Sequence, residues 1–322
     1  MRKILIIVLM LIINIFGQSV NQKYSVKKNI IKTDNKIGHY NTIEYTVMQN
    51  DDKILYQIVD KVDYDIPFPK LQIFENGNSV LLNAFYGKLT FINGNGAKVK
   101  TLNIKKDIEV AYERNIISFV DNSSLIIAFT LQNEDNSVIQ IYSDNGMLKN
   151  EFEISLININ GIAFHEKLNK IFISSIVWNK HNVMEKRITV FNENGEVIKS
   201  LKSNFEKGFF TEDNKFIANT NKSLIVINAN DSQIILKKEM NRESVLLDIN
   251  YINKEILYAF AKTPTLANGK WFYENPTIIS INEHGKLIDN KSVKIKKFSE
   301  LTLSNYHNRL KVMIDNSIVS LD

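Results

Sequence analysis

Two stretches of the chain gather the side chains best suited to recognising another molecule. "SIVWNKHNVMEKR" (175–187) contains Trp178, and "KTPTLANGKWFYENP" (262–276) contains Trp271. These are the only two tryptophans in the sequence. A large aromatic ring with a polar tip can stack on a sugar ring or anchor a peptide, and such residues dominate the binding energy of many interfaces. Both stretches are therefore candidates for a binding surface.

The predicted binding set includes aromatic and charged neighbours of the tryptophans, and residues from "DYDIPFPK" and "AYERN". The predicted ligand-binding residues are Trp178, His181, Trp271, Tyr273, Tyr64 and Arg114. The alternative is structural, because a tryptophan often fills a gap between its own loop and a neighbouring sheet.

Catalytic signatures are missing from the sequence. The chain has no cysteine, and its five histidines include no i, i+4 pair of the kind that binds zinc on a helix. His165 and His284 fall at expected hairpin turns, which predicts that both face solvent. No glycine-rich phosphate loop or nucleophile elbow is present. We predict no catalytic residue, no metal site and no cofactor.

One hairpin pattern recurs along the chain, as in "LTFINGNGAKVKTL" and "ITVFNENGEVIKSL". Each copy has an apolar run, a tight turn and a second apolar run. Glycine supplies the positive φ that such turns need, and asparagine tolerates it. The turn positions are Gly96, Gly146, Gly195 and Gly285, with Asp231 in the same place without glycine and Asp51 as a weaker copy.

A second hairpin precedes each of these turns, so the repeating unit has four strands, here named a, b, c and d. No sustained helical period interrupts the units. The five complete units are expected at Lys70–Ile104, Ile116–Ile154, Ile159–Ser203, Phe205–Met240 and Val245–Ile295.

Four-stranded units repeated about every 40–50 residues describe the blades of a β-propeller. Adjacent residues are both apolar in Leu125–Ile127 and Leu224–Ile227, which predicts strands buried on both faces, as packed blades require. The alternative is a pair of β-sandwich domains, but no Pro/Gly/Ser-rich linker separates two halves. We expect residues 20–322 to form a single all-β domain.

The expected blade number is six. The C-terminal piece "ELTLSNYHNRLKVMIDNSIVSLD" (300–322) has three short apolar runs and lacks a fourth strand. The strand "KILYQIVDK" (53–61) has no blade of its own, so the N- and C-terminal strands are expected to share one blade. Such closure would remove exposed strand edges. Ile43–Val47 could pair beside this strand, and the role of residues 20–42 stays open.

The repeated "NG" hairpin behind an apolar N-terminus resembles the six-bladed propellers of the NHL and TolB-like kind. In particular, it resembles secreted six-bladed β-propeller proteins of Bacteroidetes-like bacteria. The resemblance covers nearly the whole mature chain and rests on the hairpin pattern. It implies no catalytic residue, because the sequence contains no motif of an enzymatic propeller family.

Propeller topology places the a–b and c–d turns on one face and the b–c and d–a connections on the other. Both tryptophan-bearing stretches are expected to be b–c connections. We predict a binding or scaffolding module for a protein, peptide or carbohydrate on the b–c/d–a face. The alternative is a hydrolase or lyase with a metal or acid–base site at the central axis, because propeller enzymes assemble sites from separate blades.

The N-terminus has the layout of a secretory signal. Arg2 and Lys3 precede the apolar run Ile4–Phe16, and small residues follow at 17–19. We predict cleavage after residue 19 and a periplasmic or extracellular protein with no membrane span after cleavage; an uncleaved anchor is the alternative.

The charge balance argues against a nucleic-acid partner. The formal net charge is +5, and the densest basic patch is the short run Lys294–Lys297. A solvated strand end explains such a patch without nucleic acid. We expect a monomer.

Overall fold

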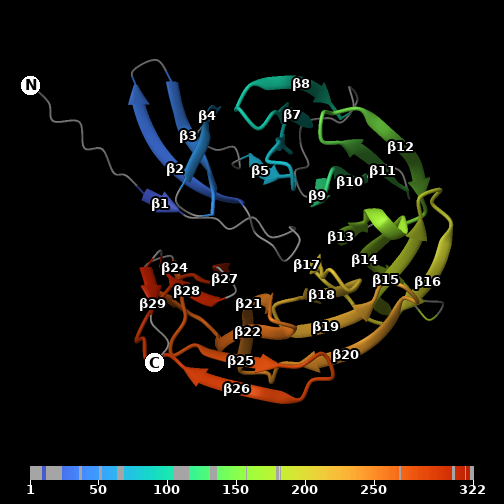
Figure 1. Cartoon of the computed structure of the whole chain (residues 1–322), viewed down its shortest axis with the longest axis vertical. Helices are drawn as coiled ribbons and strands as arrows, with labels where there is room; N and C mark the ends of the chain where they lie inside the picture. Colours follow the sequence, from blue (N-terminus) through green and yellow to red (C-terminus); the bar gives the residue numbers. More distant parts are fainter. Residues whose placement is uncertain are drawn as a thin grey trace, which may run out of the picture. The chain divides into compact units, whose positions relative to one another are not determined.

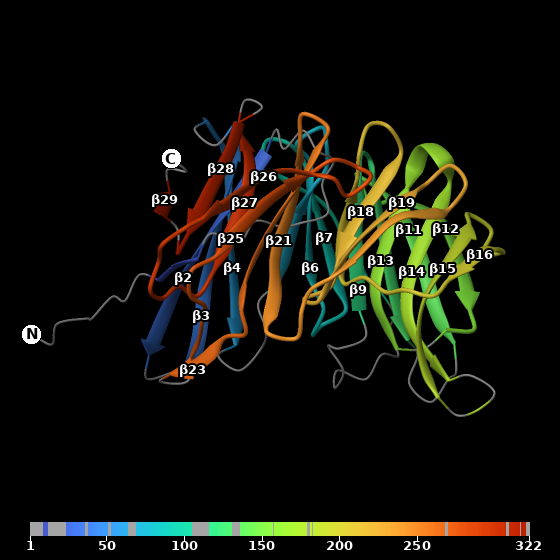
Figure 2. The ribbon, with the colours of Figure 1, turned by 90° about the horizontal axis from the view of Figure 1, so that it is seen from below.

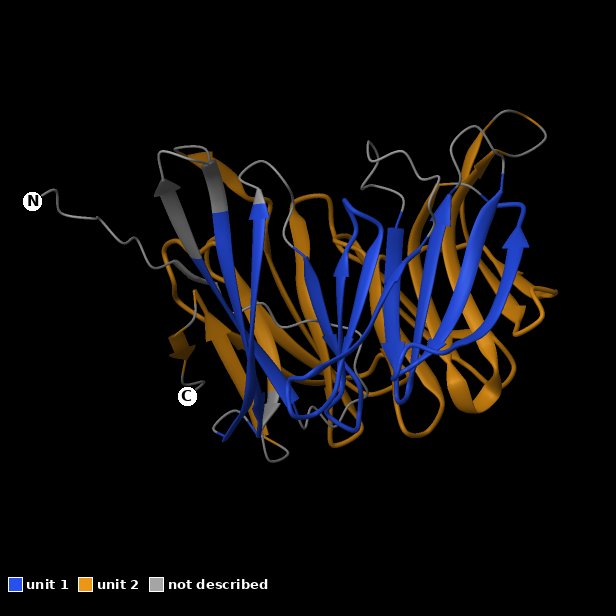
Figure 3. Ribbon diagram, turned by 90° about the horizontal axis from the view of Figure 1, so that it is seen from above, with its two compact units in different colours: residues 1–18, 22–157 blue, residues 19–21, 158–322 orange. Residues whose placement is uncertain are grey.

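The described residues form strands and one short 3₁₀ helix, η2 (Glu166–Leu168) (Figure 1). The computed structural model describes residues 9–11, 24–35, 38–50, 53–63, 69–104, 116–130, 136–156, 158–178, 181, 183–267, 270–306, 309–315 and 317–319. The chain divides into two compact units, residues 1–18 with 22–157 and residues 19–21 with 158–322 (Figure 3).

The first unit contains three antiparallel sheets, each made of consecutive strands. Sheet 1 has β1 (Leu9–Leu11), β2 (Tyr24–Asn35), β3 (Gly38–Gln49) and β4 (Lys53–Asp63); sheet 2 has β5 (Lys70–Ile73), β6 (Ser79–Asn83), β7 (Lys88–Ile92) and β8 (Lys98–Asn103); sheet 3 has β9 (Ile116–Asp121), β10 (Ser124–Thr130), β11 (Ser137–Ser143) and β12 (Leu148–Ile154).

The second unit continues the series with four further sheets and a small hairpin. Sheet 4 has β13 (Ile159–His165), β14 (Lys170–Trp178), β15 (Met184–Asn192) and β16 (Val197–Leu201); sheet 5 has β17 (Lys207–Phe210), β18 (Lys215–Asn219), β19 (Ser223–Asn228) and β20 (Gln233–Glu239); sheet 6 has β21 (Ser244–Ile252), β22 (Glu255–Lys262), β25 (Thr277–Ile281) and β26 (Leu287–Ser292); sheet 7 has β27 (Leu301–Tyr306), β28 (Arg309–Ile314) and β29 (Ser317–Val319); the hairpin is β23 (Thr265–Ala267) with β24 (Lys270–Phe272).

The sheet boundaries confirm the five units expected from the sequence, which correspond to sheets 2 to 6. The six-bladed count is wrong. Within the described residues there are seven sheets, because β4 pairs with β3 inside sheet 1 and does not complete sheet 7. The N- and C-terminal strands therefore do not share a blade. The chain is an all-β seven-bladed β-propeller.

A buried lysine explains why the sequence pattern did not predict strand β2, and with it sheet 1. From Tyr24 to Ile30 of β2 the residues alternate between buried and more exposed positions, and Lys28 occupies a buried position between Val26 and Ile30. Its ammonium lies 5.9 Å from the ring centroid of Tyr45, and burial lowers the pKa of Lys28 to about 8. A charged residue at an inward position interrupts the apolar alternation that identifies a strand.

Blade-to-blade packing forms the core within each unit. In sheet 5, β19 is buried along residues 223–227, whereas exposed and half-buried residues alternate along the outer strand β20. Val226 of β19 belongs to the same buried apolar cluster as Ile256 and Tyr258 of sheet 6. The burial of β19 on both faces confirms the interpretation of the double-apolar runs as strands between two layers.

The c–d turns share one geometry. In three of them an asparagine side chain accepts two backbone N–H groups: Asn93 from Asn95 and Ala97, Asn192 from Asn194 and Glu196, and Asn282 from His284 and Lys286. The glycine three residues after each asparagine has a φ between 79° and 82°. The strand pairing shifts at each turn, as expected for a glycine bulge. In the turn that contains Asp231, Ser232 takes the positive φ of 56°.

The turn glycines are also needed because the turns lie close to the preceding sheet. A Cβ at Gly146 would lie 2.7 Å from Cδ2 of Phe91 in sheet 2, and one at Gly96 would lie 2.8 Å from Cβ of Tyr56 in sheet 1. Gly285 approaches Leu236 of sheet 5 in the same way, at 2.8 Å. A Cβ at these distances would force the neighbouring side chain to move, which is easiest for the flexible end of Leu236. Glycine is therefore favoured both by the positive φ and by the close packing.

A buried carboxyl joins sheet 7 to sheet 6. The Leu303 N–H donates to Oδ2 of Asp248 at 2.7 Å, and Nδ2 of Asn250 donates to the Leu303 carbonyl at 2.9 Å. Asp248 lies where the pairing of β21 with β22 shifts register. Burial raises the pKa of Asp248 to about 8, with Glu300 adding to the rise and Lys207 opposing it.

Gly146→Ala is expected to destabilise the protein more than Gly87→Ala. Both glycines have positive φ, 80° and 57°, but a Cβ at Gly87 would meet nothing within 4 Å. Gly87→Ala should cost about 1–2 kcal/mol from backbone conformation alone. Gly146→Ala should cost about 1–3 kcal/mol more from overpacking against Phe91. Urea unfolding of both variants measures the difference, and equal losses would contradict the proposed packing role of the turn.

Asp248→Asn is expected to flatten the pH dependence of stability. The folded pKa of Asp248 is raised from 3.8 to about 8, so the unfolded chain releases this proton first and the free energy of unfolding falls as pH rises from about 4 to 8. Asparagine keeps an oxygen that can accept the Leu303 N–H and carries no charge. The difference in melting temperature between variant and wild type should grow in favour of the variant from pH 5 to pH 8. Parallel curves would contradict this assignment.

Candidate functional site

The first tryptophan-bearing stretch forms the end of the β14–β15 hairpin in sheet 4. Strands β14 and β15 are longer than the sequence predicted, and Trp178 pairs directly with Met184 at their ends. Both side chains are exposed, Trp178 to 61% and Met184 to 61%. The adjacent Val183 is exposed as well. The end of this hairpin thus presents an aromatic ring beside aliphatic side chains.

The second stretch repeats this arrangement on sheet 6. The connection between β22 and β25 folds back as the hairpin β23–β24, in which Leu266 pairs with Trp271. Trp271 is 57% exposed and Leu266 59% exposed. In Figure 2, β23 and the β14–β15 hairpin both lie toward the lower side of the view but well apart from each other, β23 on the left and β14–β15 on the right. We call the four residues Trp178, Met184, Leu266 and Trp271 the tryptophan pairs.

The packing alternative for the two tryptophans does not fit these exposures, because more than half of each side chain faces solvent. Large apolar side chains gathered in exposed pairs carry a hydration cost, and such patches mark interaction surfaces. Trp271 lies on the b–c connection of sheet 6, as the sequence predicted. The loop predicted at 175–187 is shorter than expected, because Trp178 is the last residue of β14 and Met184 the first of β15.

The other predicted binding residues have different environments. Tyr273 packs its ring 5.6 Å from that of Phe298 and exchanges two backbone hydrogen bonds with it, which ties the insertion to the start of sheet 7. His181 is exposed. Tyr64 and Arg114 lie outside the described residues. A ligand-binding role for these four residues stays a prediction.

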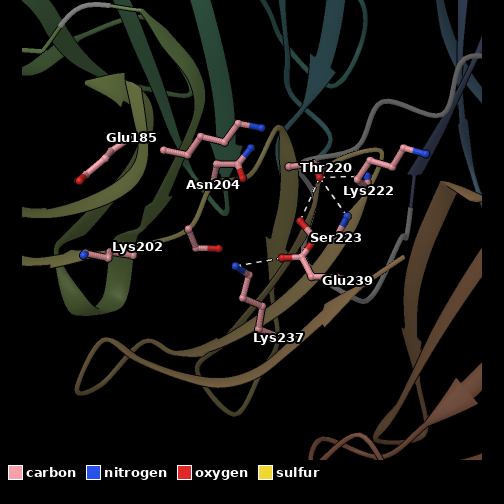
Figure 4. Close-up of a pocket in the computed structure, with 10 residues that line it drawn as sticks. Glu185, Lys202, Asn204, Thr220, Lys222, Ser223, Lys237 and Glu239 are labelled. Atoms are coloured by element: carbon pink, nitrogen blue, oxygen red, sulfur yellow. Dashed lines mark hydrogen bonds and ion pairs between the residues drawn. The ribbon is translucent and has the colours of Figure 1, made fainter. Parts of the chain in front are cut away.

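A cleft of about 330 Å³ lies between sheets 4 and 5 (Figure 4). Its walls come from the start of β15, the crossing from β16 to β17, the β18–β19 turn and the end of β20. The lining residues are Glu185, Lys186, Lys202, Ser203, Asn204, Thr220, Lys222, Ser223, Lys237 and Glu239. Because β15 begins at Met184, this cleft is next to the tryptophan pair of sheet 4.

Of these features, only the β23–β24 hairpin has a signal in the sequence. The dipeptide Asn268-Gly269 is a hairpin signal that could have predicted the pairing of Leu266 with Trp271. The cleft has no such signal, because its residues come from four separate segments of two sheets.

The histidine predictions are half right. His284 is exposed, as expected at a turn, but His165 is buried, with 4% of its surface accessible. Its Nε2 lies 3.1 Å from Oδ1 of Asn214, and its ring meets that of Phe210 edge-on. Burial is the main cause that lowers the pKa of His165. This histidine joins sheet 4 to sheet 5 and is a packing residue.

Two searches of the described residues bear on metals and membranes. Among these residues, no group of three or more His, Asp or Glu side chains is placed to hold a metal ion. The described part of the chain also contains no helix with the length and hydropathy needed to span a bilayer.

The sequence matches no protein-family model and no curated protein. Solved structures do match the fold. A structure of the mitotic checkpoint complex contains a chain that aligns with 96% of this chain and 87% of its own, at 10% identity and a TM-score of 0.58. The C-terminal WD40 domain of Sif2 aligns over 98% and 96% of the two chains, at 9% identity and a TM-score of 0.54. The Dos1 propeller aligns over 93% and 88%, at 9% identity and a TM-score of 0.54.

These matches show that the fold is a β-propeller, similar to that of the Sif2 WD40 domain. The sheets counted above give it seven blades. They correct the resemblance to six-bladed NHL and TolB-like propellers. Four-stranded blades with tight c–d hairpins are common to propellers of different blade number, so the hairpin pattern that carried the resemblance could not distinguish six blades from seven.

Proposed function

We propose that this propeller is a binding scaffold whose partner is a protein, and that the tryptophan pairs are its main anchors. The observation that carries the proposal is the repetition of one arrangement on two sheets: an exposed tryptophan directly opposite an exposed aliphatic residue. Rigid aromatic side chains lose little conformational entropy on binding, so they provide much contact area at small cost.

The strands beneath Trp178 and Met184 provide a rigid support. Ser175 and Ile173 of β14 are fully buried, and β14 and β15 remain paired from Lys170↔Asn192 out to Trp178↔Met184. An anchor held on paired strands is already arranged for binding before a partner arrives, which reduces the entropic cost of association.

A protein partner is favoured over a sugar by the neighbours of the rings. Met184 and Leu266 are aliphatic, and aliphatic side chains next to a ring suit another protein's apolar residues. A sugar needs hydrogen-bonding groups beside the stacking ring. The fold also supports this choice, since one of the matching chains comes from a structure of the mitotic checkpoint complex.

Photo-crosslinking tests the surface. A photoreactive amino acid in place of Met184 or Leu266 should give defined adducts with a protein from the native cells. The matched control is the same amino acid in place of Val197, which is 63% exposed at the c–d hairpin of sheet 4. Trp178→Ala with Trp271→Ala should remove the adducts and leave the melting temperature within about a degree, since both rings are exposed.

Three results would count against the proposal. Adducts of equal yield from position 197 would show non-specific capture. A large drop in melting temperature of the double tryptophan variant would make the rings structural. Tryptophan-dependent binding on a glycan array, without protein adducts, would replace the protein partner by a carbohydrate.

We also propose that the protein is exported, as the basic start, apolar run and small residues of segment 1–19 indicate. Leu9–Leu11 form β1 beside β2 in the full chain, so cleavage after residue 19 would remove that strand. Mass spectrometry of protein from the native cell envelope or medium should give a chain that begins near residue 20. A full-length cytoplasmic product would contradict export.

A further inference from the structure

The cleft between sheets 4 and 5 contains more positive than negative charge. Four of its lining residues are lysines and two are glutamates. Each glutamate already has a cationic neighbour: Oε2 of Glu185 accepts from Nη2 of Arg187 at 2.8 Å, and Oε1 of Glu239 lies 3.0 Å from Nζ of Lys237. The carboxylates inside the cleft are therefore neutralised locally.

The remaining lysines have no carboxylate partner among the described residues. Nζ of Lys222 donates to the carbonyls of Arg242 and Ser244, at 3.1 and 2.7 Å, which holds the side chain in place without cancelling its charge. Lys186 and Lys202 make no ion pair within the described part of the chain, and Figure 4 shows the ammonium groups of Lys202 and Lys222 at opposite ends of the cleft. Three ammonium charges at one cleft attract an anion.

A buried hydroxyl in the same cleft lacks a partner. Ser203 is 4% exposed, and its Oγ has no hydrogen-bond partner in the described structure. An unsatisfied buried polar group costs about 1–3 kcal/mol, so an arriving acceptor would recover this loss. The hydroxyls of Thr220 and Ser223 lie 3.0 Å apart on the opposite wall. Lysine ammonium groups and hydroxyls together suit an oxyanion.

We infer that this cleft binds an anionic side chain of the protein partner, either a carboxylate or a phosphate group, while an apolar residue of the same segment covers Trp178 and Met184. The inference rests on the proposed function. The chain itself connects the two sites, because Glu185 and Lys186 directly follow Met184 in β15. The partner segment is therefore acidic and apolar in close succession.

Calorimetric titration of the full chain tests the inference with defined probes. Hexaglutamate, a phosphoserine peptide and inorganic phosphate should bind, and hexaglutamine should not. Stronger binding of the phosphoserine peptide than of hexaglutamate would assign the anion as phosphate, and the reverse order would assign it as carboxylate. Binding should weaken steeply as salt rises from 50 to 500 mM, because exposed charges are screened.

Matched variants separate the cleft from the general charge of the protein. Lys186→Gln with Lys202→Gln should weaken binding of the anionic probes about tenfold. Lys286→Gln with Lys296→Gln removes the same charge at exposed positions outside the cleft and should change binding less than twofold. Equal losses in both double variants would overturn the inference, as would no binding of any anionic probe.

Ser203→Ala tests the buried hydroxyl independently of charge. Alanine removes an unsatisfied group, so the free chain should be as stable as wild type or more stable, while affinity for the anionic probe should fall about three- to tenfold. Unchanged affinity would remove Ser203 from the site. If the tryptophan variants still abolish the photo-adducts while no anionic probe binds, the proposed function stands and this inference fails.

Discussion

The close approach of the c–d turns of sheets 2, 3, 5 and 6 to the sheet before each is the constraint on which the described architecture depends. Within the units, Gly96, Gly146 and Gly285 bring turn backbone so close to the preceding sheet that a Cβ there would force the neighbouring side chain to move. Lysines from the preceding sheet complete the contact: Nζ of Lys100 donates to the Gly146 carbonyl, and Nζ of Lys199 to the Asp231 carbonyl. A chain without cysteine thus fixes successive sheets by fitted turns, with apolar packing beneath them.

This constraint explains which parts of the fold could be predicted from the sequence. The turn chemistry is local, so the Asn-Gly pattern predicted hairpins, and the hairpins predicted sheets 2 to 6 with nearly correct boundaries. The blade number depends on the two ends of the chain, where the local pattern is weakest. In β2 the inward position of Lys28 hides the strand, and in β29 the strand is only three residues long. Blade number is also a property of the whole set of sheets, and no single hairpin records it.

The candidate site also has parts that local sequence predicts and parts that it does not. The tryptophan-bearing insertions are continuous in sequence and were predicted as b–c connections. Their aliphatic partners were not, because pairing across a hairpin requires the strand register, which for Trp178↔Met184 depends on how far β14 and β15 extend. The lysine cleft could not be predicted at all. Its walls come from two sheets, and a surface lysine such as Lys186 has no sequence feature that distinguishes it from any other charged residue of a strand.

The turn geometry also determines where binding can evolve. At the c–d ends of sheets 2, 3 and 6 the glycine-containing turn is short and lies against the preceding sheet, so an insertion there would break the blade-to-blade contact. The b–c connections carry no such requirement. The one after β22 accommodates an additional hairpin, and Gly87 in another has open space around it. Partner recognition is therefore expected at the b–c end, because insertions and exposed aromatic residues can accumulate there without loss of the packing that holds the sheets together.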